Sequence, residues 1–170
     1  MITVTEEKKQ QYLNFHLPTY KEIPAVGLYL DQVSKYINDG LKDIPGCVIT
    51  NSMIANYVKH KLITNPVKKQ YGRDQIAYLI FIVLTKNTLS LEDVHDLFDL
   101  QNNVSTAEEA YSFFADVFET NLHEIFTYEQ LKSADNTTWR RKLMSNIVLS
   151  SVQRIYLNEL LQAASSINFE

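Results

Sequence analysis

Apolar residues recur at spacings of three and four along most of this chain, and that spacing is the period of an amphipathic α-helix. Residues 76–84 differ, because they are apolar on nearly every side, which predicts a buried central helix. The pattern predicts an all-α fold, with at most one small hairpin near residues 64–72. The stripes that support it are Leu30, Val33, Ile37 and Leu41; Ile54, Tyr57 or Val58, and Leu62; Leu91, Val94, Leu97 and Phe98; Ala110, Phe113, Phe114, Val117, Phe118, Leu122 and Phe126; and Leu143, Met144, Ile147, Val148, Val152, Ile155 and Leu160.

Residues that cap or interrupt helices mark where several of these helices begin and end. Residues 50–52 are Thr, Asn and Ser, which are all favourable N-cap residues, so a helix should begin there. Pro66 should end this helix. Ser90-Leu-Glu-Asp93 and Thr106-Ala-Glu-Glu109 have the spacing of a capping box. We therefore expect a further helix to begin at each of these two motifs.

The length of 170 residues fits one domain, or one small domain with a helical extension. We expect an N-terminal arm and strap at residues 1–28. The polar arm, residues 1–14, should be helical or frayed, and the strap, residues 15–28, should be irregular because it contains Pro18, Pro24 and Gly27. A helix–turn–helix domain should follow at residues 29–100. Residues 101–170 should form a helical region that serves dimerisation or effector binding.

The residue patterns give little support to a catalytic, cofactor or metal site. The four Gly are isolated, so there is no glycine-rich phosphate loop, and the single Cys has no neighbours that mark it as reactive. The pairs His95 with Asp99 and Glu119 with His123 have a metal-ligand spacing that helices often show by chance. We expect no enzyme, no cofactor and no metal ion.

The distribution of apolar residues also bears on the compartment. The first residues lack the apolar core of a signal peptide, and the central uncharged run Ile76–Thr85 is too short to span a bilayer. With one cysteine, no internal disulfide can form. We expect a cytoplasmic protein that has no membrane partner.

Charge is distributed unevenly along the chain, although the formal net charge is only -4. Between residues 48 and 84 the chain carries Lys59, Lys61, Lys68, Lys69 and Arg73 against one acid, Asp74. The next 45 residues, 87–131, contain ten acids and no Lys or Arg. This asymmetry favours nucleic-acid binding by the basic part of the chain.

The basic part also has the spacing of a helix that could enter a DNA groove. Ser52, Asn56 and Lys59 share one helix face, and Asn can pair with adenine while Lys suits guanine or phosphate. Lys68, Lys69 and Arg73 follow, where a short wing could track the phosphate backbone.

Several motifs resemble the winged helix–turn–helix of the MerR-type regulators. In that family a recognition helix of the form S-x-T-L-R-Y-Y-E-x-x-G-L-I leads to a Pro, a basic wing, an R-x-Y element, a helix and a phrase like L-G-F-S-L-E-E-I. This chain has SMIANYVKHKLI at residues 52–63, then Pro66, KKQYGRDQIAYL at 68–79 and NTLSLEDV at 87–94. Ala55, Asn56 and Lys61 stand where the family has Arg, the first Tyr and Gly. The resemblance covers residues 29–100 and implies binding of duplex DNA.

A second resemblance covers nearly the whole chain. The phrases LPTYKEIPAVGLYLDQVSKYI, ITNSMIANYVKHKLI and PVKKQYGRDQIAYLIFI resemble the uncharacterised YkrK-like domain family of Gram-positive bacteria. We expect a bacterial transcriptional regulator. The predicted DNA-binding residues are Ser52, Asn56, Tyr57, Lys59, Lys61, Lys68, Lys69, Tyr71 and Arg73.

Two features leave the partners open. Helix–turn–helix domains commonly bind paired half-sites, so we expect a homodimer, with the helices after Thr106 as its surface. The aromatic stripe in those helices could instead line an effector pocket or form plain core. The alternative function is a non-enzymatic protein-interaction module, in which the helix at residues 52–63 packs on a partner protein and the lysines are rim charges.

Overall fold

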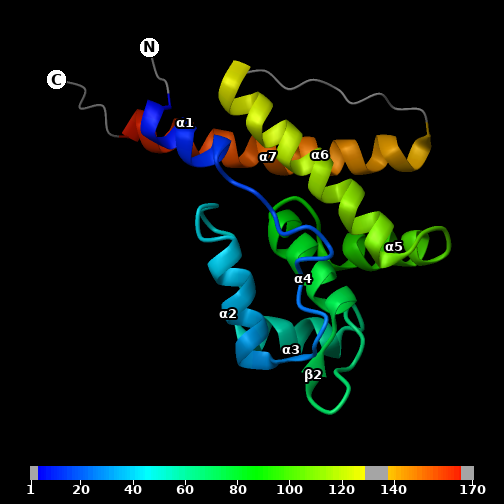
Figure 1. The fold of residues 1–170 in the computed structure, drawn as a ribbon. Helices are drawn as coiled ribbons and strands as arrows, with labels where there is room; N and C mark the ends of the chain where they lie inside the picture. Colours follow the sequence, from blue (N-terminus) through cyan, green and yellow to red (C-terminus); the bar gives the residue numbers. More distant parts are fainter. Residues whose placement is uncertain (1–3, 129–137, 166–170) are drawn as a thin grey trace. The chain divides into compact units, whose positions relative to one another are not determined.

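The computed structural model describes residues 4–128 and 138–165, and the chain is helical over most of this length (Figure 1). The prediction of a mainly helical fold is confirmed. The elements are α1 (Glu6–Leu13), β1 (Leu28–Tyr29), α2 (Leu30–Gly40), α3 (Asn51–Lys59), β2 (Gln70–Tyr71), α4 (Arg73–Thr85), α5 (Leu91–Asn102), α6 (Ala107–Tyr128) and α7 (Trp139–Ser165).

The chain forms two compact units. The central unit is Leu17–Asp116, and the terminal unit combines Met1–His16 with Val117–Glu170. The helix α6 supplies its first part to the central unit and its second part to the terminal unit. No helix within the described parts of the chain is both long enough and apolar enough to cross a membrane.

The core of the central unit is built around α4, as its uninterrupted apolar sequence predicts. Every residue from Leu79 to Thr85 is buried, and the Thr85 hydroxyl donates to the Phe81 carbonyl at 2.8 Å. Phe81 packs edge-on against Phe114 of α6, with ring centroids 4.9 Å apart. The buried polar residue is therefore satisfied within its own helix.

Both expected capping boxes form. Ser90 and Asp93 exchange hydrogen bonds of 3.0 and 2.8 Å at the start of α5, and Thr106 and Glu109 exchange bonds of 3.2 and 2.9 Å ahead of α6. In each case the backbone N–H of the capping residue holds the pKa of the carboxyl below its ordinary value. These bonds explain why the two helices begin where the sequence motifs stand.

The terminal unit joins α1, the second part of α6 and α7 through aromatic side chains. Tyr12 stacks on Phe126 with ring centroids 4.1 Å apart, and its hydroxyl donates to the buried Glu159 carboxylate at 2.8 Å. Tyr156 of α7 and Phe126 form a T-shaped pair, with ring centroids 5.3 Å apart. Phe118 and Phe126 of the aromatic stripe are buried here, which favours the core interpretation of that stripe.

Candidate nucleic-acid interface

The helix α2 organises the basic part of the central unit, because α3, α4 and both short strands pack against it. Its apolar stripe buries Val33 and Ile37, and α3 buries Ile54 and Tyr57. The Asn38 amide group fixes the connection between α2 and α3, since it donates to the Ile49 carbonyl and accepts from the Ile49 N–H, each at 2.8 Å. These bonds tie the connection between the two helices to α2.

The outward face of α3 carries the polar residues that the sequence placed there. Thr50 is the N-cap, and its hydroxyl accepts the Met53 N–H at 3.2 Å. Ser52, Asn56 and Lys59 are exposed, on the side of the helix opposite Ile54 and Tyr57. Tyr57 is 5 % exposed, and burial raises the pKa of its phenol. It therefore anchors the buried face of α3 in the core.

The end of α3 is a Schellman turn with a lysine in its left-handed position. The Lys61 N–H donates to the Val58 carbonyl at 3.0 Å, and the Leu62 N–H reaches back to the Tyr57 carbonyl at 2.9 Å. Lys61 has a φ of 59°. Gly is usual at this position because it carries no Cβ to clash in the left-handed region.

The segment 64–72, which we call the wing, contains a β-hairpin with a two-residue turn, and β2 follows that turn. Val67 and Gln70 exchange backbone hydrogen bonds of 3.0 and 2.9 Å across the turn. Lys68 and Lys69, the two central residues, have φ values of 51° and 64°. Positive φ at both central positions is the geometry of a type I′ turn, which favours Asn-Gly and here contains Lys-Lys.

The strand β1, which the sequence pattern did not reveal, completes the wing as a small antiparallel sheet. Leu28 pairs with Tyr71, and Tyr29 pairs with Gln70. Tyr71 is 5 % exposed and its phenol has a raised pKa because of burial, so it anchors the wing rather than facing solvent. The strap was expected to be irregular up to residue 28, and its last residue, Leu28, instead joins this sheet.

Arg73 lies just after the wing and holds the strap. Its guanidinium donates to the Ile23 carbonyl at 2.7 Å and to the Lys21 carbonyl at 3.2 Å, and it lies 5.4 Å from the centre of the Tyr20 ring. The Tyr20 hydroxyl donates to Asp74, and burial together with that carboxylate raises the pKa of Tyr20 to about 12. Arg73 therefore has a structural role in the central unit, and its expected phosphate contact stays a prediction.

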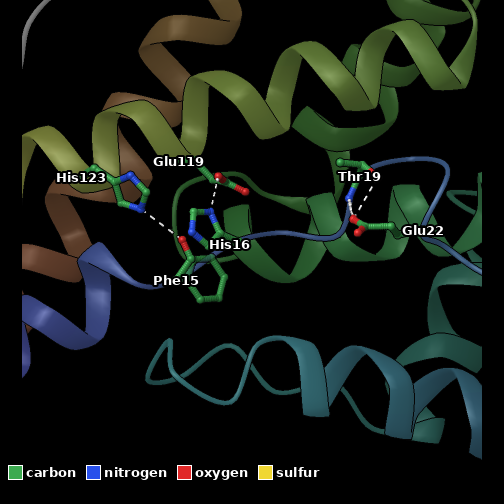
Figure 2. Close-up of polar contacts among 6 residues, drawn as sticks. All are labelled: Phe15, His16, Thr19, Glu22, Glu119 and His123. Carbon is green, nitrogen blue, oxygen red and sulfur yellow. Dashed lines mark hydrogen bonds and ion pairs between the residues drawn. The ribbon is translucent and has the colours of Figure 1, made fainter.

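Polar contacts also close the strap on itself. The backbone N–H and hydroxyl of Thr19 donate to the Glu22 carboxylate at 2.7 and 2.9 Å (Figure 2). The backbone bond lowers the pKa of Glu22. The Tyr111 hydroxyl of α6 donates to the Pro18 carbonyl at 2.7 Å, so that the strap has fixed points along its length.

Besides Arg73, the basic residues between residues 48 and 84 are Lys59, Lys61, Lys68 and Lys69, and we call these four together the basic surface. All four are exposed, and none makes an ion pair with any residue that the structure describes. Asp74, the nearest acid in sequence, bonds to Tyr20. The basic surface therefore keeps its charge uncompensated by acidic partners among the described residues.

Histidine contacts occur elsewhere in the molecule. In the terminal unit, His16 Nδ1 lies 3.1 Å from a Glu119 carboxylate oxygen, and His123 Nε2 donates to the Phe15 carbonyl at 3.0 Å (Figure 2). On α5, His95 Nδ1 lies 3.4 Å from Asp99. Within residues 4–128 and 138–165, no group of three or more His, Cys, Asp or Glu is arranged to hold a metal ion.

Cys47 is buried between α2 and α3. Burial raises the pKa of its thiol to about 11, although the Lys86 ammonium lowers it in part. A thiol with a raised pKa is a poor nucleophile at neutral pH, because the thiolate is the reactive form. Cys47 therefore has an apolar packing role.

Comparisons with known proteins return one match. No curated protein and no solved structure matches this chain. One family model, described as a domain of unknown function (DUF1836), matches residues 18–120, which contain almost all of the central unit and the basic surface. Since the match spans more than half of the sequence, the chain belongs to the DUF1836 family.

Proposed function

We propose that this chain is a bacterial transcriptional regulator that binds duplex DNA through the central unit. In this proposal α2 and α3 act as a MerR-like helix–turn–helix, and residues 64–72 act as a short basic wing. Ser52, Asn56 and Lys59 would face the major groove, which admits an α-helix. The resemblance to the YkrK-like family is part of the same proposal.

One observation carries the proposal. Three non-glycine residues in the described parts of the chain have positive φ, and all three are lysines of the basic surface: Lys61, Lys68 and Lys69. An L-residue in the left-handed conformation costs about 1–2 kcal/mol, and Gly or Asn would lower that cost. The MerR-type motif has Gly at the position of Lys61. Strain of this kind persists where a function needs it, and here it is combined with exposed positive charge.

Phosphate binding would explain why lysine, rather than Gly or Asn, occupies these strained positions. Each phosphate that a lysine neutralises releases a condensed counterion, which supplies most of the affinity for DNA of any sequence. Arg73, Tyr57 and Tyr71 would then contribute by holding the wing and α3 in place, because they pack within the central unit. A small-molecule effector is compatible with this function and would use the aromatic stripe of the helices after Thr106.

A homodimer is part of the proposal, with the long helices after Thr106 as its surface. Two copies would let two recognition helices read paired half-sites. Light scattering at micromolar concentration, with and without DNA, should give twice the mass of 19.7 kDa. A monomer under both conditions would contradict this part.

The second candidate function is a protein-interaction module. Exposed apolar side chains near the lysines of the turn favour it, since Tyr29 of β1 and Val67 of the wing are both accessible. In this alternative the lysines would form the charged rim of an interface with a partner protein.

Salt-dependent binding to random-sequence duplex DNA tests the first candidate. Lys68→Ala with Lys69→Ala should weaken binding, and the slope of log affinity against log salt should shrink by about 2, close to one unit per lost phosphate contact. Alanine keeps a Cβ, so the backbone strain is nearly unchanged. Lys142→Ala with Arg154→Ala is the matched control, because it removes two exposed charges from α7. Equal binding by wild type and wing variant would contradict the proposal.

A further inference from the structure

The wing and β1 together present a row of three side chains, none of which belongs to the basic surface. Tyr29 and Val67 each lie directly opposite Gln70, in the β1–β2 pairing and across the turn. Directly opposite residues of an antiparallel pair project from the same face of the sheet. We call Tyr29, Gln70 and Val67 the outer sheet face. The alternate pair, Leu28 with Tyr71, projects from the other face, where Tyr71 is buried.

The outer sheet face is apolar at both ends and open to solvent. Tyr29 is 52 % exposed and Val67 is 74 % exposed. Single exposed apolar residues are common on proteins, but these two flank one polar residue in a continuous row. Their backbones pair with Gln70, and Tyr29 is also the N-cap of α2, but both side chains are largely accessible to solvent and so are available to a partner.

The middle of the row is closely packed, because Gly27 of the strap lies directly against the side chain of Gln70. A Cβ at Gly27 would lie 2.7 Å from the Gln70 Cβ, so any larger residue would force the strap and β2 apart. The Gly72 N–H donates to the Gln75 side chain at 2.7 Å and fixes the other end of β2. A fixed apolar row can contact a partner with little loss of conformational entropy.

The positive charges next to the row indicate the chemistry of the partner that it would contact. Lys68 and Lys69 follow Val67 directly and precede Gln70, so two uncompensated cations stand at the tip of the outer sheet face. Duplex DNA offers the matching chemistry, since its charged phosphates alternate with deoxyribose rings whose carbon faces are apolar. We propose that Tyr29 and Val67 pack against deoxyribose next to the phosphates that Lys68 and Lys69 bind. This inference rests on the DNA binding proposed above and assigns it a second kind of contact.

The two kinds of contact differ in their response to salt. Lysine–phosphate contacts release counterions and change the salt slope, whereas apolar contacts with sugar release none. Tyr29→Ser with Val67→Thr removes the apolar surface and keeps residues that suit an N-cap and a strand. We expect about a tenfold loss of affinity for random duplex DNA, from partial loss of two buried apolar side chains, with an unchanged salt slope.

Controls separate the outcomes. Val104→Thr changes another exposed valine, after α5, and should leave binding unchanged. Val67→Thr alone is nearly isosteric and should show part of the loss even if the double variant folds poorly, as circular dichroism would reveal. Full affinity in both variants, while the double lysine variant is weakened, would overturn this inference alone and leave the row to a protein partner. A changed slope would also overturn it, and a wild type that does not bind duplex DNA would overturn both proposals.

Discussion

Replacing the turn residues of the wing by those that its backbone favours should stabilise the protein and weaken DNA binding at the same time. The variant is Lys68→Asn with Lys69→Gly, since Asn-Gly is the preferred pair for a type I′ turn. The φ values of 51° and 64° place both lysines in the left-handed region. Two such residues cost about 2–4 kcal/mol together.

The net gain is smaller than this cost. Asn keeps part of the penalty at position 68, and Gly at position 69 adds about 0.5–1 kcal/mol of unfolded-state entropy. We expect the free energy of unfolding to rise by about 1–2 kcal/mol, measured as a higher urea midpoint at constant slope. Far-ultraviolet circular dichroism suits the measurement, because the single Trp, Trp139, lies in α7 of the terminal unit and does not report on the wing.

Binding should change in the opposite direction. Loss of two lysine–phosphate contacts should reduce the salt slope by about 1.8 and lower affinity for every duplex. The alanine pair at the same positions is the control, because it should weaken DNA binding equally without the gain in stability. A variant no more stable than wild type would refute the argument from strain. A stabilised variant with full affinity would refute the assignment of the two lysines to phosphate.

Three further substitutions test other parts of the structure. Asn56→Ala should weaken binding to a selected cognate duplex by about 1–3 kcal/mol and leave random-sequence binding unchanged, and an equal loss on both would place Asn56 on the DNA backbone. Gly27→Ala puts a methyl group 2.7 Å from the Gln70 Cβ and should lower the free energy of unfolding by about 1–3 kcal/mol in urea, whereas wild-type stability would mean that the strap yields freely. Glu109→Gln should reduce the loss of stability in acid. The folded-state pKa of Glu109 lies below its ordinary value of 4.5, so the stabilisation from its cap is complete above that pH and is lost as pH falls through the lowered pKa. An unchanged midpoint-against-pH curve would exclude Glu109 from the acid response.

The amino-acid sequence by itself determined the helices and the exposed face of α3. Apolar spacing located α2, α4 and the long helices after Thr106, and the capping boxes marked the starts of α5 and α6. These features are local, because a helix forms its hydrogen bonds within a few residues and buries one face of a repeating pattern. The same periodicity placed Ser52, Asn56 and Lys59 opposite Ile54, and the structure agrees.

The sequence predicted a hairpin near residues 64–72, but only the tertiary structure decided its pairing with β1 and the conformation of its turn. Two-residue strands are too short to show an alternating pattern, so the pairing of Leu28 with Tyr71 was invisible in the sequence. Lys-Lys is no turn signal, and its left-handed conformation is imposed by the hydrogen bonds that join Val67 to Gln70 and by the pairing with β1. The role of Arg73 likewise depends on carbonyls about fifty residues earlier in the chain. Contacts between distant segments set these features, and no local pattern of residues encodes them.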